Sequence, residues 1–295
     1  MVCACIDIGS NTTRLLVAES VDGRLRELLR QRAFTRVGKG LKRADRISAK
    51  KIAEVAEVVA TQVRLAQELG TETLRAVATA AIREADNQED LLSAIHDAAG
   101  VSVDVLSDED EARLAFVGAT RALERAPDGE MAVIDVGGAS CEIAYGTMLA
   151  GVRWSASFRV GSGFLADSYL RSDPPSVEEL QGVRAHVAGV FEGFELAAPE
   201  LAIAVGGSAT SLRRLVGAEL EHETLERGLR ILASTPMEEV ARRFELEPER
   251  VRLLPAGMLI LEEFSDRLAR PLLIGKGGLR EGVILDLLSS GRVAG

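Results

Sequence analysis

The first residues of the chain show the apolar runs and apolar–polar alternation that are typical of β-strands. Residues 2–8 are apolar apart from one acid, and the segments 14–19 and 24–34 are separated by the pair Asp22-Gly23. An Asp-Gly pair between two such segments is a strong signal for a hairpin. We therefore expect a three-stranded antiparallel meander at the start of the chain.

Helical and strand patterns alternate beyond the meander. Ser48 is a favoured helix N-cap, apolar residues follow it at three- and four-residue steps, and Gly70 is placed to end the helix. The next expected elements are a strand at 74–78, a helix at 87–99, a strand at 101–106 and a helix capped by Asp108. Glu111 lies three residues after that cap, as in a capping box, so a purely structural role for this acid is one interpretation.

The second half of the chain repeats the same order of patterns. Three strands are predicted first, and helices and strands then alternate. These elements are strands at 131–135, 141–145 and 152–158, helices from Phe164, Ser176 and Thr210, a strand at 201–205, helical residues over 224–268, a strand at 271–274 and a helix at 279–288. This repetition indicates two α/β domains related by duplication.

The clearest break between the two halves is the segment 126–129, Ala-Pro-Asp-Gly. We place the first domain at 1–126 and the second at 127–278. The segment 279–295 contains apolar positions at helical spacing that need a partner. We expect this C-terminal helix to pack back on the first domain.

An acid and a glycine turn follow an apolar strand in each half of the chain. Residues 6–11 read Ile-Asp-Ile-Gly-Ser-Asn, and residues 134–138 read Ile-Asp-Val-Gly-Gly, with Glu142 just beyond. Residues 205–208, Val-Gly-Gly-Ser, form a third such turn. Glycines let backbone N–H groups approach an anion, and Mg²⁺ takes hard oxygen ligands. One turn alone is more often a simple hairpin, but the repetition favours two phosphate loops of a Mg²⁺–phosphate site.

Composition narrows the class of protein. The 295 residues are 47% hydrophobic and 27% charged, which is typical of a globular protein, and the net charge of −10 argues against general nucleic-acid binding. No apolar run is long enough to span a bilayer, and the N-terminus enters a strand directly, so we expect a cytoplasmic protein without membrane attachment. Residues 36–46 hold five basic residues. A solvated loop is the simpler interpretation of this basic segment, and a patch that attracts a polyanion is the alternative.

The cysteines are Cys3, Cys5 and Cys141, and they form no C-x-x-C pair. We interpret them as small buried residues in a reducing compartment. The three histidines are scattered and lack the spacing of metal ligands.

Six motifs together cover nearly the whole length of the chain. They are Asp7–Leu15, Ala78–Asn87, Ser107–Leu114, the turn at Asp135, Gly206–Thr210 and Gly278–Gly282. In this order they resemble the exopolyphosphatase and guanosine pentaphosphate phosphohydrolase family, the Ppx/GppA phosphatases of the actin-like ATPase superfamily. The resemblance implies two duplicated ribonuclease H-like domains with an active-site cleft between them. It also implies hydrolysis of terminal phosphates with Mg²⁺ as cofactor and Mn²⁺ as the alternative.

The resemblance implies roles for individual residues as well. Glu111 matches the glutamate that activates the attacking water, and Asp135 and Glu142 match acids of the catalytic and metal site. The residues implied in phosphate binding are Gly9, Ser10, Asn11, Arg14, Arg83, Gly137, Gly138, Ser140, Gly207 and Ser208. These roles agree with the chemistry, because a phosphoanhydride is already activated and the enzyme mainly positions water and neutralises charge.

Other interpretations and departures from the family pattern accompany these roles. For Arg83 the structural alternative is an ion pair with Glu84 or Asp86. Ala139 stands where the family usually has a third glycine, and Lys276 lies where a serine-aspartate pair is usual. We interpret Lys276 as a solvated side chain.

We therefore expect an exopolyphosphatase that acts on inorganic polyphosphate. The alternatives are a guanosine pentaphosphate phosphohydrolase and a catalytically weak regulator that binds phosphate chains. A kinase of the same superfamily ranks last, since no base or sugar pocket is evident and aromatic content is only 4%. Neither nucleic acid nor a membrane is expected as a partner, and the sequence leaves open whether the protein forms a homodimer.

Overall fold

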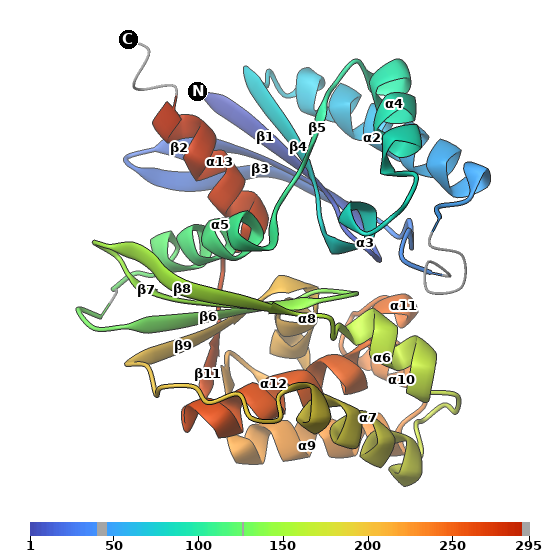
Figure 1. The fold of residues 1–295 in the computed structure, drawn as a ribbon, viewed down its shortest axis with the longest axis vertical. Coiled ribbons are helices and arrows are strands. Elements are labelled where there is room, and N and C mark those ends of the chain that lie inside the picture. Colours follow the sequence, from blue (N-terminus) through green and yellow to red (C-terminus); the bar gives the residue numbers. More distant parts are fainter. Residues whose placement is uncertain (40–45, 126, 291–295) are drawn as a thin grey trace. The chain divides into compact units, whose positions relative to one another are not determined.

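The computed structural model describes residues 1–39, 46–125 and 127–290, which fold as two compact units. One unit contains Met1–Ala122 together with the chain from Gly277 onward, and we call it the N-terminal unit. The other contains Leu123–Lys276, and we call it the second unit. Each unit holds one mixed β-sheet flanked by helices (Figure 1). The predicted α/β class is therefore confirmed.

The sheet of the N-terminal unit has five strands in the order β3-β2-β1-β4-β5. They are β1 (Val2–Ile8), β2 (Thr13–Val21), β3 (Arg24–Ala33), β4 (Thr73–Ala78) and β5 (Val103–Val105). The first three form the antiparallel meander that the sequence predicts, and β4 and β5 extend the sheet in parallel. Asp22 and Gly23 have φ values of 50° and 78°, as a tight Asp-Gly hairpin turn requires.

Helices cover both faces of this sheet. They are α2 (Ala49–Glu68), α3 (Ala80–Arg83), α4 (Gln88–Ala99), α5 (Asp108–Arg121) and α13 (Leu279–Ser290). Alternate residues of β1 face the two helical layers: Ile6 packs in one cluster with Val59 of α2, and Cys5 in another with Val283 of α13. Burial on both faces explains why β1 is apolar almost throughout. The cysteines are free and buried, as predicted.

The second unit repeats this strand order. Its six-stranded sheet runs β10-β11-β9-β6-β7-β8, and the strands from β8 to β11 follow the order and directions of β3-β2-β1-β4-β5. The strands are β6 (Met131–Val136), β7 (Cys141–Thr147), β8 (Gly151–Phe158), β9 (Leu201–Val205), β10 (Glu219–Leu220) and β11 (Leu272–Ile274). The helices are α6 (Ser162–Tyr169), α7 (Val177–Val190), α8 (Gly206–Val216), α9 (His222–Ser234), α10 (Met237–Arg243), α11 (Pro248–Val251) and α12 (Leu254–Leu268). The shared order supports the duplication inferred from the sequence.

The last helix, α13, packs along α5 and β1 of the N-terminal unit. The backbones of α5 and α13 are in direct contact where the two helices meet. A Cβ atom added to Gly118 would lie 1.9 Å from the carbonyl oxygen of Gly278, and one added to Gly282 would lie 1.9 Å from the carbonyl oxygen of Leu114. Glycine at these two positions therefore allows a helix contact that a larger side chain would separate.

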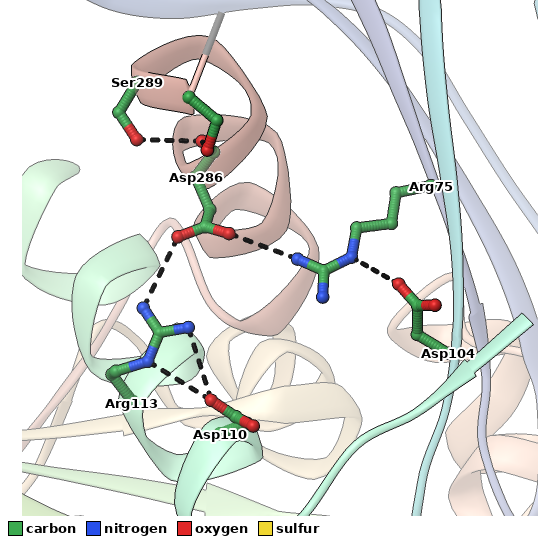
Figure 2. A network of polar contacts seen from close by, with 7 residues as sticks. Arg75, Asp104, Asp110, Arg113, Asp286 and Ser289 are labelled. Atoms are coloured by element: carbon green, nitrogen blue, oxygen red, sulfur yellow. Dashed lines mark hydrogen bonds and ion pairs between the residues drawn. The ribbon is translucent and has the colours of Figure 1, made fainter. Parts of the chain in front are cut away.

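A polar network holds the other end of α13 (Figure 2). Asp286 accepts hydrogen bonds from Arg75 of β4 at 3.1 Å and from Arg113 of α5 at 3.4 Å. Arg75 also bonds to Asp104 of β5 at 2.8 Å, and Arg113 bonds to Asp110 at 3.4 Å. One carboxylate of α13 thus links the sheet to α5.

Several local predictions differ from the structure; helix α6, for example, begins at Ser162 rather than at Phe164. The N-cap of α5 is Ser107, whose hydroxyl accepts from the backbone N–H of Asp110 at 3.1 Å, so Asp108 is the first helical residue and the capping-box interpretation is wrong. Adjacent serine and aspartate are both favoured caps, and local preference does not separate them. Helix α8 begins at Gly206 rather than Thr210. The pattern does not predict α3, because a single turn is too short to show a helical period.

The basic segment 36–46 is described only at its ends, because residues 40–45, which include Lys42 and Arg43, lie outside the described residues. Among the described helices, none combines the length and hydrophobicity that a membrane crossing requires.

Candidate active site

The first glycine turn connects β1 to β2 in the N-terminal unit. The backbone N–H of Gly9 donates to the carbonyl of Thr12 at 3.0 Å, which closes the turn. The carbonyls of Ser10 and Asn11 accept from backbone N–H groups of residues 36–38 at 2.8 and 3.0 Å. The start of the basic segment therefore braces this turn through backbone hydrogen bonds.

Asp7 lies opposite Arg14 in the β1–β2 register and is only 8% exposed. Burial raises the pKa of the Asp7 carboxyl, and the charges of Arg14 and Arg280 oppose that rise. Arg14 also donates from Nε to the hydroxyl of Thr12 at 2.8 Å. The acid beside the first turn is thus balanced by arginines of its own unit.

The second glycine turn connects β6 to β7 in the second unit. The backbone N–H of Gly137 donates to the carbonyl of Ser140 at 3.0 Å. The backbone N–H and the hydroxyl of Ser162 donate to the carbonyl of Gly137 at 3.0 and 3.1 Å, and the N–H of Phe164 donates to the carbonyl of Gly138 at 2.9 Å. The start of α6 braces this turn as the basic segment braces the first.

Asp135 lies opposite Glu142 in the β6–β7 register. Glu142 is 2% exposed and accepts a hydrogen bond from the hydroxyl of Ser157 at 3.0 Å. The equivalent register position of the N-terminal unit holds Asp7 and Arg14, an acid opposite a base. Two carboxylates opposite each other repel unless a cation or a proton lies between them. Their hard oxygen donors fit Mg²⁺, so the residues present suit that ion.

The third glycine turn leads from β9 into α8. Gly206 has a φ of +87°, and a Cβ atom at this position would lie 2.3 Å from Oδ1 of Asp135. The glycine therefore lets the Asp135 carboxylate lie against the N-terminus of α8, where backbone N–H groups favour negative charge. Ser208 is 1% exposed and lies against Gly257 of α12, and its hydroxyl has no hydrogen-bond partner in the described part of the chain.

Arg83, at the end of α3, contacts the segment that leads into α5. Its Nη1 donates to the carbonyl of Leu106 at 2.5 Å and to Oε2 of Glu111 at 3.4 Å, and its Nη2 pairs with Asp108. Glu111 is 7% exposed, and one of its carboxylate oxygens lies within 4.8 Å of a carboxylate oxygen of Asp108. Arg83 thus forms ion pairs with Asp108 and Glu111 of α5, whereas its structural alternative was a pair with Glu84 or Asp86.

The residues predicted for the N-terminal unit gather at neighbouring elements. A Cβ atom at Gly9 would lie 3.9 Å from the hydroxyl of Thr79, which immediately precedes α3. The first turn, with Ser10 and Asn11, therefore adjoins the helix that carries Arg83.

The residues predicted for the second unit gather around Asp135. The turn at 137–140 follows that acid directly, Glu142 is its partner across the strands, and Gly206 lies beside its carboxylate. Gly207 and Ser208 continue from there into α8.

Sequence reasoning did not assign Asp108, Ser157 or Ser162 to the site. Asp108 is the second residue of the motif at 107–114, where the sequence pattern predicts only a helix cap. The two serines carry no signal of their own, because each acts on a residue more than ten positions away in the chain.

The sequence profile of the Ppx/GppA phosphatase family matches residues 16–291. Exopolyphosphatase 1 from Mycobacterium tuberculosis is 29% identical to the chain, with 97% of this chain and 88% of that protein aligned. Guanosine-5'-triphosphate,3'-diphosphate pyrophosphatase from Photobacterium profundum is 25% identical, with 98% of this chain and 60% of that protein aligned.

Solved structures give the same result. The crystal structure of the Aquifex aeolicus member of the Ppx/GppA family has a TM-score of 0.83 at 28% identity, with 99% of this chain and 98% of that chain covered. The crystal structure of an exopolyphosphatase from Cytophaga hutchinsonii has a TM-score of 0.86 at 20% identity, covers 98% of each chain and supports the fold. The chain therefore belongs to the Ppx/GppA phosphatase family and is a hydrolase of phosphoric anhydride bonds.

Proposed function

We propose that the protein is an exopolyphosphatase that removes terminal phosphates from inorganic polyphosphate in a Mg²⁺-dependent reaction. The observation that carries the proposal is the cross-strand pair of Asp135 and Glu142 beside a braced glycine turn. Similarity to exopolyphosphatase 1 along nearly the whole chain supports the choice of substrate.

Asp135 and Glu142 would hold the metal ion, which when bound neutralises charge on phosphate oxygens. Their opposed positions in the strand register bring two carboxylates to one face of the sheet, where both could bind the same divalent cation. Ser157 contributes by donating to Oε1 of Glu142, which holds that carboxylate in one orientation.

The two braced turns would bind phosphate groups. The turn at 9–11 in one unit and the turn at 137–140 in the other would offer those backbone N–H groups that do not close the turns, since Gly9 and Gly137 donate within them. Gly207 and Ser208 would add the N-terminus of α8.

Two arginines would supply positive charge to the phosphate chain. Arg83 offers a guanidinium, whose planar N–H groups match phosphate oxygens, and Arg14 lies on the strand that follows the first turn.

Glu111 would act as the general base. It accepts a proton from the water that attacks the terminal phosphorus, and the bond from that phosphorus to the bridging oxygen breaks. The products are orthophosphate and a polyphosphate chain that is one phosphate shorter. Arg83 Nη1 lies 3.4 Å from Oε2 of Glu111, and this contact orients the carboxylate.

A guanosine pentaphosphate phosphohydrolase is the second candidate. The similarity to the Photobacterium profundum enzyme favours it, although this chain aligns with only 60% of that protein. The bond broken is the same, since both substrates end in a phosphoanhydride.

The test is orthophosphate release from short polyphosphate, long polyphosphate and guanosine pentaphosphate, measured side by side with Mg²⁺, with Mn²⁺ and with a chelator. We expect release from polyphosphate to be faster, and the chelator to abolish it. Faster release from guanosine pentaphosphate would establish the second candidate. Binding of polyphosphate without release from any substrate would identify a regulator instead.

A further inference from the structure

The ion pair between Arg83 and Asp108 places a carboxylate of the protein on a guanidinium that is assigned to substrate. The two side chains are 23% and 53% exposed, so the pair lies at the surface of the N-terminal unit with the acid on its more exposed side. A carboxylate and a phosphate use the same N–H groups of an arginine.

Arg83 has anchors that do not depend on Asp108. Its Nη1 donates to the carbonyl of Leu106 and to Glu111, and the residues that precede it in α3 are buried. Asp108 takes the other terminal nitrogen, Nη2. Removing Asp108 would therefore leave the guanidinium in place and expose its outward N–H groups.

We propose that Asp108 is an internal competitor of the substrate, and that its carboxylate lowers affinity for the phosphate chain by occupying Nη2 of Arg83. This inference rests on the proposed function, in which Arg83 binds that chain. A phosphate group carries more charge than a carboxylate and displaces it, but part of the binding energy is used to separate the ion pair. Asp108 is thus a residue that sets substrate affinity without taking part in bond breaking.

The size of the effect follows from the exposure of the pair. Exposed ion pairs change an equilibrium constant by about 1.4- to 5-fold. Replacing Asp108 by asparagine keeps the size of the side chain, removes its charge and weakens its hold on Arg83. We expect the KM for short polyphosphate to fall about two- to fivefold, with kcat within about twofold of the wild type.

The chain offers a matched control in Glu109. Glu109→Gln removes the same charge from the same first turn of α5, and the Glu109 side chain makes no ion pair or hydrogen bond within the described residues. Any general effect on the helix N-terminus or on the field around it appears in both variants. A fall in KM specific to Asp108→Asn supports the competitor role.

Three measurements make the test decisive. These are KM and kcat, the inhibition constant of orthophosphate, and the affinity for tripolyphosphate by titration calorimetry, each for wild type, Asp108→Asn and Glu109→Gln. The inhibition constant and the calorimetric dissociation constant should fall with KM. Asp108→Ser serves as a second variant should Asp108→Asn fold poorly, because serine is also well tolerated at a helix start.

Other results overturn the inference. A higher KM of Asp108→Asn would mean that Asp108 orients Arg83 for substrate. An equal fall in the KM of Glu109→Gln would show that the effect comes from the loss of any negative charge in this helix turn. A higher Mg²⁺ requirement of Asp108→Asn would make Asp108 a metal ligand. If the wild type releases no phosphate at all, the proposed function fails, and the calorimetric comparison still decides the role of Asp108.

Discussion

At the scale of a single residue, Glu111 has two interpretations, and the structure corrects only the capping box of the structural one. The cap of α5 is Ser107, and Glu111 is one of four acids in the first turn, so the helix does not depend on its charge. Its contact with Arg83 and its 7% exposure are features of a positioned acid.

We expect Glu111→Gln to lower kcat by about 10²–10⁴-fold, because glutamine keeps the shape but is a far weaker base. The melting temperature should stay close to that of the wild type, since one charge in a helix turn contributes about 0.3–1 kcal/mol. Steady-state kinetics and thermal unfolding check this, with Glu109→Gln as the control. Turnover within a few-fold of wild type would remove Glu111 from the role of base and direct attention to Glu142.

The pair of Asp135 and Glu142 leads to a prediction about metal binding. In the absence of metal, Glu142→Gln should be at least as stable as the wild type, because it relieves repulsion between opposed carboxylates. Mg²⁺ should raise the melting temperature of the wild type and leave that of the variant almost unchanged. Thermal unfolding with and without Mg²⁺ measures both effects. An equal Mg²⁺ stabilisation in the two proteins would contradict the assignment of this pair as metal ligands.

At the scale of elements, the crossing of α5 and α13 depends on glycine. Both helices would have to separate to admit a Cβ atom at Gly118, where the nearest backbone atom is 1.9 Å away. We expect Gly118→Ala to lower the free energy of unfolding by about 1–3 kcal/mol, as overpacking usually does.

Gly189 in α7 is the matched control, because a Cβ atom there would meet nothing within 4 Å. Gly189→Ala should raise the free energy of unfolding by about 0.5–1 kcal/mol, since alanine is the better helix former. Urea denaturation measures both variants. A neutral or stabilising Gly118→Ala would show that the two helices are not in the close contact described.

At the scale of the whole molecule, the two units share a strand order but differ in charge at their turns. The N-terminal unit opposes Asp7 with Arg14, and the second unit opposes Asp135 with Glu142. Duplication thus supplies two braced turns, while sequence divergence places an acid opposite a base in one unit and two acids opposite each other in the other.

The net charge of the whole chain is −10, so the binding of a polyanion requires a positively charged region on its surface. The basic segment begins where residues 36–38 brace the first turn. Replacing Arg36, Lys39, Lys42 and Arg43 by alanine should raise KM more for long polyphosphate than for short, and the difference should shrink as salt rises. Steady-state kinetics at several ionic strengths measure this difference in KM. An equal rise in KM for both substrates at every salt concentration would support the simpler interpretation, in which the segment is a solvated loop.

The local pattern of apolar and turn residues determined much of the secondary structure of this protein. The meander, the Asp-Gly hairpin, the duplicated order and the glycine turns follow from the alternation of apolar residues and from turn chemistry, both of which act over a few neighbouring residues. The candidate acids Glu111, Asp135 and Glu142 could also be named from the sequence, because the order of the six motifs resembles a known family and implies their roles.

Tertiary structure alone decided which distant groups meet. Arg83 pairs with Asp108 and Glu111 rather than being limited to the acids beside it, and Asp286 connects two elements that are far apart in sequence. The register that sets Glu142 against Asp135 likewise arises from strand pairing. Such contacts depend on how elements pack, and no local periodicity encodes a distance between residues so widely separated in the chain.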